Sequence, residues 1–396
     1  MISIKEAQKL ILENVLPAHT EVIEIKSSLG RVFAGDIFSD REYPPFNRSA
    51  VDGYAIQAVD FLHKNIRRFK VVGEIMAGSS YSPTFNSGEC LKIMTGAAVP
   101  ECADAVIKVE DCNEEKNAIE VKIDSLKTFF NIARQGEDSK ANEKIINKGT
   151  LIGALHLSLL AAVGRSDVKV FKPLTVAVIS TGDELVKPGE HTEVYQIRDS
   201  NSYALQGFFE DWKIPLSSRT IAKDNPEALR EAFENASSCD IIIFTGGVSM
   251  GDADFVPKVL KSAGVQEIFH QVKIRPGKPL WFGRRNNTVV FGLPGNPLSV
   301  IVGSKIFIEP YIRHAMGMGA GKVYKFPLAN KKLKKVSLDE YFLCKLVDVG
   351  QSKLEAIKSN GSGDFTSVLH SEGIALHPIN TQEIEENELV DFVFWR

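Results

Sequence analysis

The stretch Asp240-Ile-Ile-Ile-Phe-Thr-Gly-Gly-Val-Ser249 decides how the central part of the chain is organised. Its apolar, β-branched first half predicts a buried strand, and the paired glycines predict a loop leading into a helix around residues 255–262. Glycines let the backbone approach a ligand closely, so the N–H groups and hydroxyls of this loop could hold a phosphate. A plain strand-to-helix turn explains the same residues, and the loop alone leaves both interpretations open.

Two other segments repeat this pattern. Residues 174–179 form an apolar run that ends in Ser180-Thr-Gly-Asp-Glu184, and residues 288–291 form another that ends in Gly292-Leu-Pro-Gly-Asn-Pro297. Helices are expected over 201–212, after Asp224 and from 297 to about 315. Alternating strands and helices predict a parallel α/β sheet, whose ligands lie at the carboxyl ends of the strands. All three glycine-rich loops are expected at that edge, although Gly292–Pro297 is equally explained as a structural bend.

The flanking regions have different patterns. Ser3-x-x-Glu6 is a capping box that opens a helix, and residues 20–125 alternate in short segments typical of a β-rich region. Leu151–Val163 is apolar on nearly every face and stops at Gly164, which predicts a buried helix. After Gly321, short strands are expected at 341–349, 354–357, 373–377 and 389–395, so a small all-β domain ends the chain.

The composition excludes several classes of protein. With 396 residues the chain should form two to four domains. The balance of 47 basic and 50 acidic residues argues against nucleic-acid binding, and the cluster Lys331–Lys335 is expected to be a solvated strand face. The five cysteines show no C-x-x-C pairing, which favours reduced, buried thiols. No secretory signal and no apolar run near the ~20 residues of a membrane span are present, so a soluble cytoplasmic protein is expected.

Charged residues accompany the predicted loops. Glu184 and Asp254 each follow a strand at the same expected sheet edge, and carboxylates beside phosphate-binding amides are what a Mg²⁺–nucleotide site requires. Asp252 is interpreted as a helix cap. Two cations, Arg275 and Lys278, lie in the segment Arg275-Pro-Gly-Lys-Pro279. The prolines stiffen this segment, which suits it to binding an oxyanion.

Eight motifs occur in order and together resemble one family. They are Pro45–Ala55, Ile93–Ala97, Gly136–Asp138, Ser180–Leu185, Ile197–Asn201, Thr245–Gly251, Arg275–Pro279 and Gly292–Pro297. The set is similar to the MoeA-type molybdopterin molybdenumtransferases, whose animal relative is the C-terminal part of gephyrin. With its flanking lengths the resemblance covers essentially the whole chain.

The resemblance implies a function and an architecture. Such proteins insert molybdate into adenylated molybdopterin with release of AMP and need Mg²⁺; their partner is a molybdopterin adenylyltransferase of the MogA/MoaB type. The implied fold is α/β plus β, in an elongated homodimer whose sites combine domains of both subunits. Its domains would be an N-terminal α+β domain (1–43 and 134–172), an inserted β-rich domain (44–133), a doubly wound MoaB/Mog-like α/β domain (173–322) and a C-terminal β-barrel (323–396).

The resemblance also implies roles for individual residues. The catalytic residues would be Asp52, Asp138, Glu184 and Asp254, with Glu184 and Asp254 also holding Mg²⁺. Molybdate would bind to Arg275, Lys278 and Ser362. The pterin phosphate and the adenylate would contact Thr95, Ser180, Thr181, Gly182, Asp224, Thr245, Gly246, Gly247, Val248, Ser249, Pro294 and Pro297.

The chain departs from the family pattern at two positions. Leu343 stands where the family often has an arginine, and Gln271 stands where it has a lysine or arginine. Lys345 could replace the first of these cations, because strand alternation keeps it on the same face as residue 343. Both departures remove positive charge near the expected molybdate site. They suggest an alternative function, a catalytically weak pterin-binding scaffold of the gephyrin type.

Overall fold

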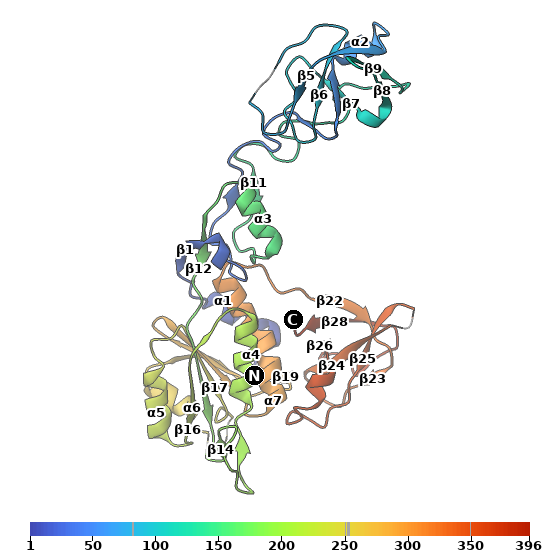
Figure 1. Cartoon of the computed structure of the whole chain (residues 1–396). Coiled ribbons are helices and arrows are strands. Elements are labelled where there is room, and N and C mark those ends of the chain that lie inside the picture. Colours follow the sequence, from blue (N-terminus) through green and yellow to red (C-terminus); the bar gives the residue numbers. More distant parts are fainter. Residues whose placement is uncertain (81–82, 250, 252–253, 349) are drawn as a thin grey trace. The chain divides into compact units, whose positions relative to one another are not determined.

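The chain is described by a computed structural model that covers residues 1–80, 83–249, 251, 254–348 and 350–396 (Figure 1). It divides into two compact units. Unit 1 comprises residues 1–34, 148–154 and 167–396, and unit 2 comprises residues 35–147 and 155–166. Within the described ranges, no helix combines the length and the apolar character needed to cross a membrane. All five cysteines are free, and four of them are buried.

A six-stranded sheet forms the centre of unit 1. Its order is β16 (Leu216–Ala222), β13 (Val176–Thr181), β17 (Ile241–Thr245), β21 (Thr288–Leu293), β20 (Trp281–Arg285) and β18 (Gln266–His270). The first four strands are parallel, as expected, whereas β20 runs antiparallel to both of its neighbours, β21 and β18, so the sheet is mixed. The reversal occurs at a hairpin between β20 and β21, where Asn286 adopts a positive φ of 53°.

Alternating side chains of the strands bury both faces of this sheet. In β17, Ile241 and Ile243 face one core, together with α1 (Ile4–Glu13), α4 (Asn201–Asp211), α7 (Pro297–Gly303) and α8 (Glu309–Ala315). Ile242 and Phe244 face a second core, together with α5 (Pro226–Asn235) and α6 (Val256–Ser262). Figure 1 shows α5 and α6 on the side of the sheet opposite α4 and α7. Helices on both faces are why these strands are continuous apolar runs.

The connections of β13 create a crevice. The chain passes from β13 through α4 to β16 on one side, and then through α5 to β17 on the other side of β13. The connection that leaves β13 through α4 and the one that leaves the adjacent strand β17 through α6 toward β18 therefore run in opposite directions across the sheet. In open α/β sheets, ligands bind outside the carboxyl ends of the strands at such a switch point.

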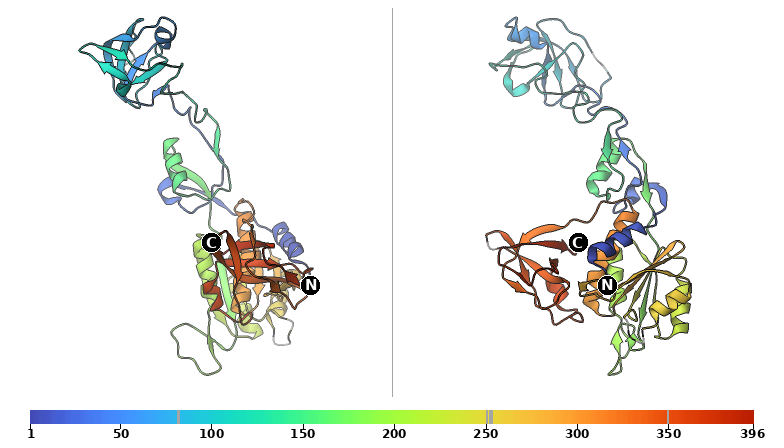
Figure 2. Two further views of the ribbon diagram at one scale, coloured as in Figure 1. Left: turned by 90° about the vertical axis from the view of Figure 1, so that its right-hand side faces the viewer. Right: turned by 180° about the vertical axis from the view of Figure 1, so that it is seen from behind.

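The N-terminal helix packs onto the sheet domain. Ser3 caps α1 by accepting the N–H of Glu6 at 3.2 Å, as the capping box predicts. Gln8 donates to the carbonyl of Ile306 at 3.1 Å, and Tyr311 accepts the N–H of Leu16 at 3.3 Å. Figure 2 shows α1, in dark blue, beside the orange helices that contain these partners. Those partners lie in the continuous helical stretch of α7, a π-helical segment (Ser304–Ile308) and α8.

A second sheet in unit 1 ends the chain. Its order is β19 (Ile274–Arg275), β24 (Asp339–Asp348), β26 (Gly373–His377), β28 (Leu389–Phe394) and β22 (Tyr324–Pro327), with β25 (Ser352–Ala356) paired to β24. A bridge between Leu328 and Leu354 joins the end of β22 to β25. β19 comes from the segment between β18 and β20, so one strand of this sheet belongs to the central part of the sequence.

One lysine of the basic cluster contradicts the expected solvated face. Lys334 is buried, and its ammonium donates to the carbonyls of Leu338 (3.0 Å) and Pro378. The carbonyl cage replaces the water that burial removes, although burial still lowers the pKa of Lys334. By contrast, Lys331 is exposed and pairs with Glu383 and Glu385.

Unit 2 is built on a third sheet. Its order is β7 (Ala105–Lys108), β4 (Gly53–Ile56), β6 (Glu89–Ile93), β5 (Arg68–Ile75), β9 (Ala118–Val121) and β8 (Cys112–Glu114). Shorter elements complete the two units: α2 (Ala58–Leu62), the pairs β2 (Ile37–Phe38) with β11 (Lys144–Ile146) and β3 (Arg48–Ser49) with β10 (Ile132–Ala133), and in unit 1 the pair β1 (Thr20–Glu24) with β12 (Asp167–Phe171). The β-rich region expected over residues 20–125 is therefore present.

The apolar helix of this region is not buried as expected. Helix α3 spans Ala154–Ala162, and among its residues only Leu160 is buried, whereas Leu155 is 85% exposed. The prediction rested on composition, but a helix of nine residues touches its neighbours through one face. Gly164 ends it with a φ of +71°, as expected.

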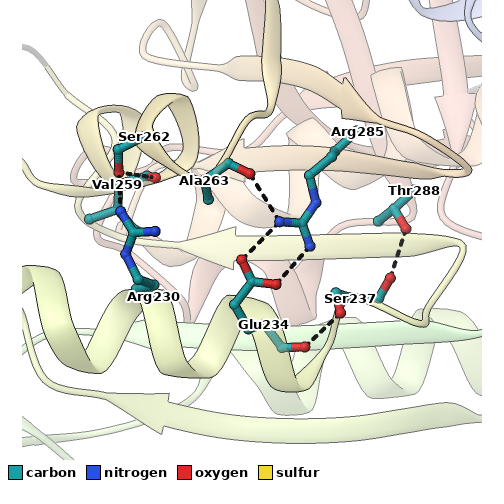
Figure 3. Close-up of polar contacts among 8 residues, drawn as sticks. All are labelled: Arg230, Glu234, Ser237, Val259, Ser262, Ala263, Arg285 and Thr288. Atoms are coloured by element: carbon teal, nitrogen blue, oxygen red, sulfur yellow. Dashed lines mark hydrogen bonds and ion pairs between the residues drawn. The ribbon is translucent and has the colours of Figure 1, made fainter.

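An arginine joins the two helices on one face of the central sheet to β20 (Figure 3). Arg285 donates from Nη1 and Nη2 to the two carboxylate oxygens of Glu234 in α5, both at 2.8 Å, and from Nη1 to the carbonyl of Ala263 after α6 at 2.9 Å. Its guanidinium also lies 4.4 Å from the ring centre of Phe233. The bidentate geometry lowers the pKa of Glu234.

We expect Arg285→Lys to lower the free energy of unfolding of unit 1 by about 1 kcal/mol, because lysine keeps the charge but loses the bidentate geometry and Glu234 is partly exposed. All three tryptophans lie in unit 1, so urea unfolding followed by tryptophan fluorescence reports on this unit. Arg284→Lys is the matched control, because the Arg284 side chain makes one hydrogen bond, to the carbonyl of Asn286. Equal midpoints for the two variants would contradict the role of Arg285.

Candidate functional site

A cavity of about 900 Å³ lies at the carboxyl ends of β13 and β17, at the switch point of the sheet. Its walls come from residues 181–201, 245–249, 254, 279 and 294–297 and from residues 363–365 of the segment 360–366, which we call the C-terminal loop; all of them belong to unit 1. The lining residues include Thr181, Glu184, Leu185, Ile197, Asp199, Asn201, Thr245, Gly247, Val248, Ser249, Asp254, Pro279, Pro294, Pro297, Gly363 and Phe365. All three glycine-rich segments predicted at this edge, the loops after β13 and β17 and the turn after β21, thus line one cavity.

The loop after β17 presents its backbone to the cavity. Gly246 (φ +96°) donates its N–H to the carbonyl of Leu293 at 3.0 Å, which ties the loop to β21. Among the described residues, the N–H groups of Gly247, Val248 and Ser249 have no hydrogen-bond acceptor. A Cβ on Gly246 would lie 2.6 Å from the carbonyl oxygen of Thr181, so only glycine fits there. Three adjacent free N–H groups form a suitable cradle for an anion.

Hydroxyl groups of β13 and β17 lie beneath this loop. The Thr245 hydroxyl donates to the Ser180 hydroxyl oxygen at 3.2 Å, and both residues are buried. The neighbouring Thr181 hydroxyl is buried beside the Asp224 carboxylate, and this interaction lowers the pKa of Asp224 against the larger effects that raise it. Buried polar atoms are normally paired, so Thr181 and Asp224 serve as polar neighbours of each other beneath the loop.

Four carboxylates gather beside the hydroxyls. The pKa of Asp224 is raised, first by burial and then by the negative charges of Asp183, Glu184 and Asp254. Asp183 accepts the N–H of Asp224 at 3.2 Å, and Asp254 accepts the N–H of Gly251 at 2.9 Å. Asp224 Oδ1 is buried, and the Thr181 hydroxyl beside it partly offsets the rise in the pKa of Asp224. The predicted cap Asp252 lies outside the described residues.

This cluster suits a cation that is shared with a ligand. No group of three His, Cys, Asp or Glu residues in the described ranges is arranged to enclose a metal ion by itself. Mg²⁺, however, usually takes one or two carboxylates and completes its shell with water and substrate phosphates. Glu184 and Asp254, which both line the cavity, fit that mode of binding.

The turn after β21 is already engaged with the C-terminal loop. Leu298 donates its N–H to the carbonyl of Ser362 at 3.1 Å, and the Asn296 amide donates to the Ser362 hydroxyl oxygen at 2.9 Å. Asn201 braces the same turn by donating to the carbonyl of Gly295 at 2.7 Å. These contacts support a structural bend at Gly292–Pro297 and bring residues around Ser362 to the cavity.

The predicted molybdate cations lie apart from the lining of this cavity. Arg275 and Lys278 are exposed, and neither is among the residues that the structure describes as lining it, although Pro279 is. Leu343 is buried in the core, so its position offers no side chain to a ligand. Lys345 pairs with Glu355 across β24 and β25 at 3.3 Å, which neutralises the cation expected to replace the missing arginine.

The remaining predicted site residues belong to unit 2. Asp52 accepts the N–H and the hydroxyl of Thr95, both at 2.7 Å, and these bonds lower the pKa of Asp52. Asp138 is exposed and donates its N–H to the carbonyl of Tyr43 at 2.9 Å. Both carboxylates are thus accessible in their own unit.

Comparison with known proteins identifies the family. Residues 2–164 match the family model "MoeA N-terminal region (domain I and II)", and residues 177–314 match "Probable molybdopterin binding domain". The chain is 31% identical to the molybdopterin molybdenumtransferase of Staphylococcus epidermidis, with 99% of this chain and 95% of the relative covered. The enzyme of the same name from Haemophilus influenzae is 33% identical, with 94% and 93% covered.

The chain belongs to the molybdopterin molybdenumtransferase family. This is a family of enzymes, and the resemblance drawn from the eight motifs is confirmed. A crystal structure of the molybdopterin biosynthesis MoeA protein from Pyrococcus horikoshii superposes with a TM-score of 0.87 at 29% identity over the full length of both chains. The multidomain α/β architecture is therefore that of the MoeA proteins.

Three residues at the candidate site of this family member were not assigned a role from sequence. Asp183 and Asn201 lie inside quoted motifs, and their spacing alone does not show that they hold Asp224 and Gly295. Phe365 follows Gly-Ser-Gly in the last domain, and an isolated phenylalanine in a loop gives no signal until the loop is placed against the cavity.

We expect Asp224→Asn to raise the free energy of unfolding of unit 1 at pH 7. A raised carboxyl pKa means that the folded chain binds the proton more tightly than the unfolded chain, so ionisation costs stability. This cost is complete above the folded-state pKa and disappears as the pH falls below the unfolded value near 3.8. Tryptophan-detected urea unfolding at pH 7 and in mild acid measures it.

The control is Asp124→Asn, which removes an exposed carboxylate in unit 2. Its unfolding midpoint for unit 1 should equal that of the unmodified chain at both pH values. A lower stability of Asp224→Asn at pH 7 would show that the carboxylate cluster is not repulsive.

Proposed function

We propose that this chain inserts molybdate into adenylated molybdopterin, with release of AMP, to give the molybdenum cofactor. The observation that carries the proposal is the run of three N–H groups at Gly247–Ser249 that have no acceptor among the described residues, beside four carboxylates at the switch point. An anion cradle next to a cation site suits a phosphoanhydride substrate. Membership of the molybdopterin molybdenumtransferase family supports molybdopterin as a part of that substrate.

The two loops at the switch point would bind the phosphates. The N–H groups of Gly247, Val248 and Ser249 would hold one phosphate, with the Thr181 and Thr245 hydroxyls beneath. Glycines at 182, 246 and 247 keep the backbone open to the ligand. The turn at Pro294 and Pro297 would close the far wall of the same cavity.

Glu184 and Asp254 would hold Mg²⁺ together with oxygens of the substrate phosphates. The ion would supply positive charge to stabilise the negative charge that develops as the phosphoanhydride breaks. Asp183 and Asp224 would increase the attraction of the site for the ion, because their charges raise the local negative potential. Without a cation these charges add to the effect of burial, which is the first cause of the raised pKa of Asp224.

Molybdate would bind to Arg275, Lys278 and Ser362. The two side-chain cations are exposed and held in a segment stiffened by Pro276 and Pro279. The Ser362 hydroxyl, oriented by the Asn296 amide, retains a proton to donate to an oxyanion. The soft sulfur ligands of the metal come from the molybdopterin itself, so no cysteine of the chain is needed.

The functional form would be a cytoplasmic homodimer with the four domains bounded at residues 43, 133, 172 and 322. Asp52, Thr95 and Asp138 of one subunit would complete the site of the other. Support comes from the exposed apolar surface of α3, where Leu155 and Leu159 would gain by burial. The Leu328–Leu354 bridge supports a closed C-terminal β-barrel. A molybdopterin adenylyltransferase would supply the adenylated substrate.

Incubation of the chain with adenylated molybdopterin, molybdate and Mg²⁺ is expected to release AMP. Glu184→Gln and Asp254→Asn should each lower the rate on the order of 10²-fold, because each removes charge aimed at the breaking anhydride. Chromatographic quantification of AMP measures the rate, and tungstate in place of molybdate tests the preference for the metal. Glu193→Gln, in the exposed loop before β15 (Ile197–Arg198), is the control and should keep the full rate.

Absence of AMP above a protein-free sample would refute the proposed activity. Tight binding of adenylated molybdopterin without molybdate-dependent AMP release would instead favour the scaffold function that Leu343 and Gln271 suggest. Unchanged rates in both acidic variants would leave the activity intact and refute the roles of Glu184 and Asp254.

Leu155→Lys is expected to weaken the dimer at least tenfold, since it places a charge in an apolar contact. Sedimentation velocity over a range of protein concentrations measures the dissociation constant. Leu369→Lys is the matched control, because Leu369 is 84% exposed in the C-terminal domain. A monomeric unmodified chain, or an unchanged constant in Leu155→Lys, would exclude α3 as the interface.

A further inference from the structure

The most exposed phenylalanine of the chain lies at the cavity. Phe365 is 63% exposed, compared with 43% for Phe38 and 41% for Phe46. It lines the cavity at the switch point although it belongs to the C-terminal loop. Isolated exposed apolar residues are common, so exposure alone says little. The question is whether this ring is held in place.

The backbone on both sides of Phe365 is fixed. The Asp364 carboxylate accepts the N–H groups of Asn360, Thr366 and Ser367 at 3.0–3.1 Å and the Thr366 hydroxyl at 2.9 Å. These bonds hold the pKa of Asp364 far below its ordinary value. Together they form a rigid turn that presents the next side chain outward.

The same loop is anchored to the central sheet domain. Ser362 accepts from the Leu298 N–H at 3.1 Å and from the Asn296 amide at 2.9 Å, and Asn296 and Pro297 line the cavity. The ring of Phe365 is thus pre-positioned at the cavity wall while its surface remains in contact with solvent. The side chain of Phe365 therefore keeps an exposed fraction of 63%.

Other apolar side chains share the cavity with this ring. Leu185, Ile197, Val248 and Pro279 are among its lining residues, in addition to the polar groups that would bind phosphates and Mg²⁺. A ligand that fills about 900 Å³ must therefore offer both anionic groups and an apolar part, and the ring of Phe365 suits a flat one. Planar heteroaromatic rings meet this requirement.

We propose that Phe365 is a specificity-determining residue whose ring stacks on a planar heteroaromatic ring of the substrate. This inference rests on the proposed function, which supplies two such rings, the pterin and the adenine. Stacking of a nucleobase on an aromatic side chain contributes about 1–3 kcal/mol, equivalent to roughly a 5- to 150-fold change in affinity. The ring is a binding group and takes no part in bond breaking.

The experiment compares Phe365→Ala and Phe365→Tyr with the unmodified chain. Binding of AMP and of molybdopterin is measured separately by titration calorimetry, so the two arms show which ring stacks on Phe365. We expect Phe365→Ala to weaken one probe at least fivefold and Phe365→Tyr to stay within about twofold, since tyrosine keeps the aromatic face. Leu369→Ala, which removes an exposed apolar side chain outside the cavity lining, should bind both probes normally.

A structural role would give a different result. Because the ring is mostly exposed, Phe365→Ala should unfold at the same urea concentration as the unmodified chain, and in the AMP-release assay KM should rise more than kcat falls. Affinities for both probes within twofold of the unmodified chain would overturn the inference. Those binding data do not depend on turnover, so weaker binding in a chain that releases no AMP would refute the proposed reaction and keep the stacking role.

Discussion

The parallel pairing of β13 with β17 is the constraint on which the site depends. Its register sets Ser180 opposite Thr245, and their hydroxyls form a hydrogen bond near the carboxyl ends of both strands. The connections that leave β13 and β17 run in opposite directions, which places the switch point between these two strands. The glycine-rich loop, the buried Thr181 hydroxyl and the carboxylates of Asp183, Glu184 and Asp254 follow directly from this pair of strands.

Much of this arrangement could be predicted from the sequence. The strands β13, β17 and β21 are buried on both faces. Their sequences are therefore continuous apolar runs, which predict buried strands. β16 was missed because it is an edge strand whose central residues, Ser217–Thr220, are all exposed, so its sequence carries no apolar run. The burial of Lys334 and the exposure of Leu155 were wrong predictions for a related reason. Both depend on the tertiary structure, which brings the Pro378 carbonyl to Lys334 and leaves Leu155 exposed.

The residues of the candidate site, like the strands, could be predicted from the sequence only in part. Carboxylates and glycines that follow strands were found from their position along the chain. The contacts that orient them, such as Asp183 to Asp224 and Asn296 to Ser362, join residues 41 and 66 positions apart. Only the tertiary structure reveals them. Arg275 illustrates the limit: its segment forms β19 and pairs with β24, so its placement follows from the C-terminal sheet rather than from its own motif.

The chain enters unit 2 twice, at residues 35–147 and 155–166, and this affects the order in which a nascent polypeptide can fold. Every residue of unit 2 has been translated by position 166, whereas the helical partners of α1 lie near residues 306 and 311. At about 5–20 residues per second, the ribosome needs roughly 10–50 s to add residues 167–396. During that interval unit 2 can fold, while the apolar face of α1 has no native surface to cover it. Helix α1 is thus synthesised before unit 2 but can be buried only after residues 306 and 311 have been added.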